Sequence, residues 1–151
     1  MCVNIGDVFR WGNYPDPRYG AEIKARWFIC IGKTDLFSQP AFFYTCTTTT
    51  QVQHFVKGGS RNGHDHFLFN TKEFPFFTDD CILDYQEPLI PITQDQLDRC
   101  KKDIQSMGCL DENRLRMIYN KLLKSPNSSR KILTDIHISL NNAGITGLKK
   151  P

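Results

Sequence analysis

One arginine and a run of threonines stand where two apolar segments of the chain would meet. Arg26 opens the segment 26–33, and Thr47 and Thr48 begin the run TTTT that ends the segment 41–47. If the two segments pair as antiparallel strands, the start of the first lies beside the end of the second. A guanidinium contacts two phosphate oxygens and hydroxyls add neutral hydrogen bonds, so the pattern predicts a phosphate-binding site. Two simpler interpretations stay open: Arg26 pairs with a carboxylate, and the threonines serve β-propensity.

Two histidines, His64 and His66, flank Asp65. Two imidazoles on one face of a strand could bind a metal ion, with a carboxylate or Cys81 as a further ligand. Alternatively, one of them, or His54, transfers protons beside a bound anion, because histidine titrates near neutral pH. The pattern favours a polar junction between a loop and a strand, and we predict no resident metal or other cofactor.

The loop NYPDPRYG places Arg18 beside Tyr19, close to Tyr14. Tyrosines next to a basic residue can stack on unpaired bases, which predicts contacts to single-stranded nucleic acid. The alternative is that these rings belong to the core, as most aromatic side chains do.

The composition is that of one globular domain: 151 residues, 40 % hydrophobic and 23 % charged. No apolar stretch is long enough to cross a membrane, and the first residues lack the features of a secretory signal, so we expect a cytoplasmic protein. The six cysteines show no metal or redox spacing, which predicts free thiols. Residues 99–151 carry eleven Lys and Arg against four Asp and Glu, which indicates either an anionic partner or solvated helix faces.

The elements that must position these residues follow two sequence patterns, first one typical of strands and then one typical of helices. Short apolar runs separated by turn residues predict strands at 7–12, 26–33, 41–47, 66–70 and 81–85. A capping box at Thr93 and Gln96 then opens a helix that we expect to end at Gly108, and Asp111 and Ser128 or Ser129 cap two more. The prediction is a single α+β domain, with a small β-barrel or bent sheet in residues 1–92 and about three helices in residues 93–151.

The motifs GDVFRWG, GAEIKAR and TCTTTT, in this order, resemble the MazF/PemK-type endoribonuclease toxins of bacterial toxin–antitoxin systems. The resemblance covers roughly residues 6–51. It implies an SH3-like β-barrel, a homodimer, a neutralising antitoxin protein, and cleavage of single-stranded RNA without a metal. Arg26–Trp27 stands where the family has arginine and proline, so a non-catalytic module that binds protein or nucleic acid is the alternative.

The resemblance also implies roles for individual residues. Arg26 corresponds to the catalytic arginine, Thr47 to the catalytic threonine, and Thr48 to the neighbouring hydroxyl. Glu22 matches an acidic residue of the family motif. The predicted RNA-binding set joins the residues around this motif to the loop residues and the histidine pair: Arg18, Tyr19, Glu22, Lys24, His64 and His66.

Overall fold

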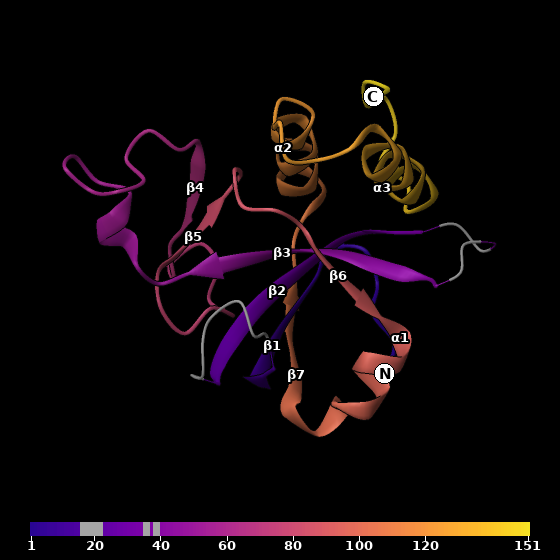
Figure 1. Cartoon of the computed structure of the whole chain (residues 1–151), viewed down its shortest axis with the longest axis horizontal. Coiled ribbons are helices and arrows are strands. Elements are labelled where there is room, and N and C mark those ends of the chain that lie inside the picture. Colours follow the sequence, from indigo (N-terminus) through magenta and orange to yellow (C-terminus); the bar gives the residue numbers. More distant parts are fainter. Residues whose placement is uncertain (16–22, 35–36, 38–39) are drawn as a thin grey trace.

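The computed structural model describes residues 1–15, 23–34, 37 and 40–151 (Figure 1). The described chain forms strands and helices in mixed order, which confirms the α+β class. The strands are β1 (Asp7–Tyr14), β2 (Lys24–Lys33), β3 (Phe42–Thr49), β4 (His66–Phe69), β5 (Cys81–Asp84), β6 (Ile90–Thr93) and β7 (Ile104–Cys109). The helices are α1 (Gln94–Arg99), α2 (Glu112–Leu122) and α3 (Arg130–Asn142), with short 3-10 turns η2 (Val52–His54) and η3 (Lys101–Asp103).

All seven strands belong to one antiparallel sheet with the order β4-β5-β3-β2-β1-β7. Two strands share the outer edge of β3: β6 pairs with its first half, from Phe42 to Thr45, and β5 pairs with Thr48 and Thr49. No ladder joins β4 to β7 within the described residues, so the sheet is open. The predicted closed barrel is therefore not confirmed.

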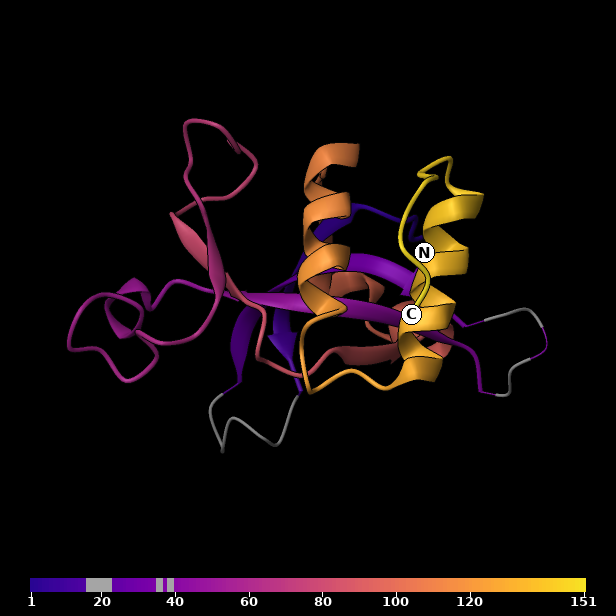
Figure 2. The same ribbon diagram turned by 90° about the horizontal axis from the view of Figure 1, so that it is seen from above.

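The sheet has a hydrophobic core on each face, because side chains alternate along its strands. On β2, Ile29 and Ile31 belong to the core under α2 and α3, together with Ile136 of α3. The residues between them on β2, Phe28 and Cys30, belong to the other core, with Leu97 of α1 among its members. Figures 1 and 2 show α2 and α3 side by side over one face of the sheet. This arrangement leaves the ends of β2 and β3 at the rim of both cores.

Helix α3 is fixed closely to the sheet. A Cβ atom added at Gly32 of β2 would lie 2.8 Å from Ile136 Cγ1, so only glycine allows this approach. The hydroxyl of Ser139 lies 3.0 Å from the backbone nitrogen of Lys33 and 3.1 Å from its carbonyl oxygen. Tyr44 of β3 donates a hydrogen bond of 2.9 Å to a buried carboxylate of α3, Asp135. These contacts join α3 to both central strands.

The prediction that the first helix runs to Gly108 is wrong. The capping box at Thr93 forms, but α1 ends at Arg99, and Ile104–Cys109 is a strand that pairs with β1. The residues Ile104 and Met107 have helical spacing, yet pairing with the open edge of β1 overrides that local pattern. Gly108 serves close packing instead, because a Cβ there would lie 2.7 Å from Phe76 Cδ1.

The two later helices are confirmed with their caps. The side chain of Asp111 accepts a hydrogen bond from the backbone of Arg114, and that of Ser129 accepts one from Ile132.

Strand β6 is not predicted from the sequence because it is short and contains Pro91, which weakens a strand pattern. No helix in the described part of the chain is long and apolar enough to span a membrane.

Candidate anion-binding site

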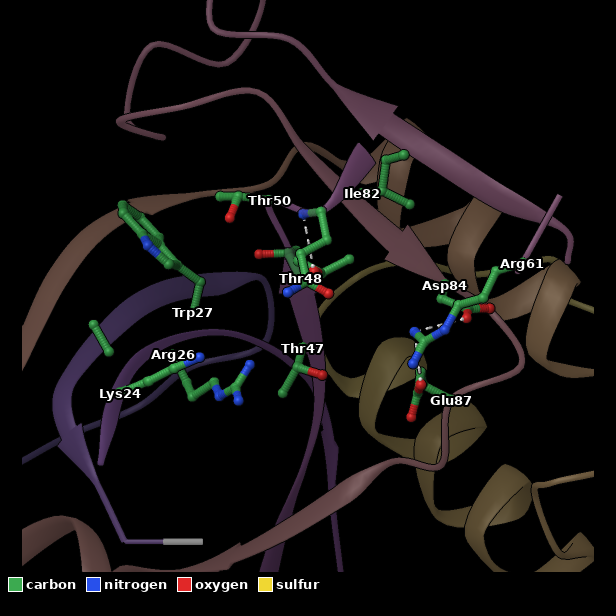
Figure 3. Close-up of a pocket in the computed structure, with 13 residues that line it drawn as sticks. Lys24, Arg26, Trp27, Thr47, Thr48, Thr50, Arg61, Ile82, Asp84 and Glu87 are labelled. Carbon is green, nitrogen blue, oxygen red and sulfur yellow. Dashed lines mark hydrogen bonds and ion pairs between the residues drawn. The ribbon is translucent and has the colours of Figure 1, made fainter. Parts of the chain in front are cut away.

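A cavity of about 430 Å³ opens where β2 begins and β3 ends. Its wall on the β2 side carries Lys24 and Arg26. The wall on the other side carries Arg61, Asp84 and Glu87 (Figure 3). Between them run the last residues of β3, Thr47 to Thr49, and Thr50 directly after the strand. In the part of the chain that the structure describes, the cavity thus collects three cations, two carboxylates and several threonines.

The register of β2 and β3 places Arg26 and Thr47 on the same face of the sheet. Phe28 pairs with Thr47, and side chains of paired residues point to one face. Arg26 lies two residues before Phe28 and therefore shares that face. Both side chains are partly buried, and Figure 3 shows the guanidinium of Arg26 extending toward Thr47. The juxtaposition expected from the sequence is present.

Thr48 differs from its neighbour because it pairs with Trp27 and points to the opposite face. Its side chain is buried and hydrogen-bonded to the thiol of Cys81. Burial raises the pKa of this thiol to about 11, although the bond to Thr48 acts in the other direction. The hydroxyl that shares a face with Thr47 belongs instead to Thr49, which accepts a hydrogen bond of 3.2 Å from the backbone of Gln51.

A buried carboxylate organises the second wall. The side chain of Asp84 is 2 % exposed, and its Oδ2 lies 2.9 Å from Nδ1 of His64 and 3.4 Å from the guanidinium of Arg61. Its Oδ1 accepts a hydrogen bond from the backbone of Gln86. Arg61 also pairs with Glu87 at 2.9 Å. Because a carboxylate only accepts hydrogen bonds, Nδ1 of His64 donates to Asp84, and in the neutral imidazole Nε2 is then the acceptor.

The other predicted residues are placed as follows. Lys24 borders the cavity and is exposed. The side chain of His66 has partners other than Asp84: its Nδ1 donates to the backbone carbonyl of His64, and its ring packs against Phe55. Tyr14 packs against the core rings of Trp11 and Phe28. The remaining predicted RNA contacts lie outside the described residues: Arg18, Tyr19 and Glu22.

The grouping needed for a metal at the histidine pair does not form in the described part of the chain. His64 and His66 have separate partners, Asp84 and a backbone carbonyl. Across the described residues, no three His, Cys, Asp or Glu side chains are arranged to hold a metal ion. The site is therefore described by its cations and hydroxyls.

Sequence reasoning missed the second wall of the cavity. Arg61 lies in the glycine-rich loop KGGSRNGHD, whose turn residues mark it as functional surface. Asp84 stands between apolar residues in CILDY, and a carboxylate in a buried strand requires a charged or hydrogen-bonded partner. That rule shows that Asp84 needs partners, but the partners come from separate segments of the chain.

The arrangement as a whole suits an anion that carries hydrogen-bond acceptors. Among the described residues, three cations and two carboxylates border the cavity, and both carboxylates contact Arg61. A phosphodiester fits this pattern, because guanidinium, ammonium and hydroxyl groups bind its oxygens. In comparisons with known proteins, no family model matches the chain and no curated protein matches its sequence.

Proposed function

We propose that the chain is a metal-independent endoribonuclease toxin of the MazF/PemK type, which cleaves single-stranded RNA by attack of a ribose 2′-hydroxyl. The observation that supports this proposal is the position of Arg26 and Thr47 on one face, at one open cavity. This proposal includes the cytoplasmic homodimer, the antitoxin partner and the SH3-like barrel that the resemblance implies. In this proposal, the open sheet corresponds to such a barrel in which the two outermost strands, β4 and β7, do not pair.

The reaction requires stabilisation of a phosphorane whose charge grows as the 2′-oxygen attacks phosphorus. In the proposed mechanism, the guanidinium of Arg26 neutralises that charge, and the hydroxyl of Thr47 donates a hydrogen bond to a non-bridging oxygen. Lys24 binds a neighbouring phosphate.

Cleavage also needs proton transfer, since the 2′-hydroxyl loses a proton and the 5′-oxygen gains one. Arginine hardly deprotonates, so Arg26 is unsuited to this role. We assign it to His64, which is not among the described residues that line the cavity but contacts Asp84 in its wall at 2.9 Å, so that this carboxylate fixes its orientation. Protonated Nδ1 facing the carboxylate leaves Nε2 as the basic atom.

The second candidate is a non-catalytic module that binds a protein or nucleic acid through the same cavity. Two observations favour it. Arg61 is already paired with Asp84 and Glu87, and Thr48 presents its hydroxyl to Cys81 on the opposite face. Both features reduce the number of donors available to a reacting phosphate.

RNA cleavage in the presence of a chelator tests the proposal. We expect the purified chain to cut a long single-stranded RNA and to leave 2′,3′-cyclic phosphate ends, as attack by the 2′-hydroxyl requires. Arg26→Ala and Thr47→Val should each reduce the rate at least about 100-fold, the cost of losing one preorganised donor.

The matched controls are Arg99→Ala on α1 and Thr134→Val on α3, which remove the same groups far from the cavity. Both should leave the rate unchanged. RNA binding without cleavage would select the binding module, and absence of RNA binding would refute a nucleic-acid role for the cavity. Cleavage that survives both Arg26→Ala and Thr47→Val would refute the assigned chemistry.

A further inference from the structure

A second cavity, of about 660 Å³, lies between the end of α2, the start of α3 and the last residues of the chain. Its cations are Lys124, Arg130, Lys149 and Lys150. All four are exposed, and none takes part in an ion pair within the described ranges. The described residues that line this basic groove include no Asp or Glu side chain, and Pro151 brings one carboxylate, that of the chain end. Positive charge is therefore in excess in this groove, whereas Arg61 in the first cavity is paired with two acidic side chains.

The floor of the basic groove is aliphatic. Leu133 is 7 % exposed, and Leu123 and Pro151 are half-buried beside it. No aromatic side chain is among the described residues that line the groove. Single-stranded nucleic acid is bound through stacking on aromatic rings, so this lining is poorly suited to RNA bases. A ligand with an aliphatic side chain between acidic residues matches both the aliphatic floor and the cationic rim of the groove.

The basic groove is held in shape by the final segment of the chain. The hydroxyl of Tyr119 on α2 donates a 2.5 Å hydrogen bond to the carbonyl of Lys149. Nε2 of His137 on α3 lies 3.2 Å from the carbonyl of Leu148. These two contacts anchor the segment to both helices and place Lys149 beside the groove. A preformed site costs less ordering on binding.

The start of α3 adds to the positive potential. Arg130 is its first residue, and its first turn contains no acidic side chain. The partial positive charge of a helix N-terminus is therefore not offset there.

We propose that the basic groove binds an acidic peptide segment of a partner protein. An aliphatic side chain of the peptide packs between Leu123 and Leu133, and its carboxylates contact the four surrounding cations. This surface is separate from the first cavity, so the inference is independent of the proposed ribonuclease activity.

Fluorescence anisotropy on the full chain tests this proposal. The probe is a short labelled peptide of glutamates around one leucine, titrated at low and physiological salt. We expect Lys124→Glu combined with Lys150→Glu to weaken binding at least about tenfold. The matched control is Lys101→Glu combined with Lys102→Glu, the same charge change on the exposed turn η3. It should bind as the unmodified chain does.

A peptide with serine in place of leucine tests the aliphatic floor without altering the protein, and we expect it to bind about tenfold more weakly. Circular dichroism establishes that the variants are folded. An equal loss in both double variants would reduce the effect to net charge and overturn the proposal. So would equal binding of the serine peptide, or no measurable binding of the leucine peptide. If oligouridylate displaced the peptide, and if the groove variant also bound oligouridylate more weakly, the groove would be a nucleic-acid surface instead.

Discussion

The approach of α3 to β2 at Gly32 allows a quantitative prediction for Gly32→Ala. The added Cβ would lie 2.8 Å from Cγ1 of Ile136 and 3.1 Å from its Cα. Real Cβ atoms do not approach other carbons so closely, so one of the two elements must move. Isoleucine strongly prefers one rotamer in a helix, and the Cα atom belongs to the backbone. The side chain therefore cannot turn away.

Movement of α3 is costly because other contacts fix its position. The hydroxyl of Ser139 bonds both backbone groups of Lys33, and Tyr44 bonds Asp135. Overpacking of a core costs about 1–3 kcal/mol, and a clash that reaches the backbone belongs in the upper part of that range. We expect Gly32→Ala to lower the free energy of unfolding by about 2–3 kcal/mol, which is about 4–12 °C in Tm for a chain of this size.

Urea denaturation followed by circular dichroism measures this loss. Gly63→Ala is the matched control, because a Cβ there meets no atom within 4 Å, and we expect a change of at most about 0.5 kcal/mol. Combining Gly32→Ala with Ile136→Ala removes the 2.8 Å contact. The loss of unfolding free energy in this double variant should therefore be at least about 1 kcal/mol smaller than the sum of the two single losses. A loss at Gly32 no larger than at Gly63, or full additivity with Ile136→Ala, would refute the explanation by close packing.

Two further predictions concern buried groups. Asp84→Ala leaves His64 and Arg61 without their buried partner. Because both side chains are about one-third exposed, water replaces part of the interaction. We expect urea denaturation to show a loss of about 2 kcal/mol in the free energy of unfolding. Asp84→Asn removes the charge but keeps an acceptor for the backbone of Gln86, so it should lose less. Equal losses would mean that this hydrogen bond contributes nothing and that the charge accounts for the whole effect. Burial raises the pKa of the Cys46 thiol from 9.0 to about 12. The thiol thus ionises first in the unfolded chain, so its contribution to stability is intact below pH 9 and is lost between pH 9 and 12, at about 1.4 kcal/mol per pH unit. Cys46→Ala should make the decline above pH 9 shallower by this amount, and an unchanged slope would contradict it.

The pairing of β2 with β3 could be predicted because the signal is local. Arg26 begins one apolar run, Thr47 ends the next, and a short connection favours antiparallel neighbours. The alternation of side chains should also have separated Thr48 from Thr47, since a period of two sends adjacent residues to opposite faces. The resemblance grouped the two hydroxyls, and the register separates them.

Features that depend on distant segments could not be predicted from the sequence in this way. Strand β7 forms because it completes the edge of β1, about a hundred residues earlier in the chain, and nothing in Ile104–Cys109 itself specifies that partner. The same holds for the second wall of the cavity. Asp84 meets Arg61 and His64 only after β4 and β5 have paired, which brings the glycine-rich loop to the sheet.

The division of one edge of β3 between β6 and β5 has a consequence for the accuracy of the site. The ladder with β6 ends at Thr45 and the ladder with β5 begins at Thr48, so Cys46 and Thr47 form a short span held at both ends. A sideways shift of Thr47 would have to loosen hydrogen bonds in at least one of these flanking ladders. Its hydroxyl is therefore located by the sheet itself, so the surrounding connections can change in length or composition without displacing it.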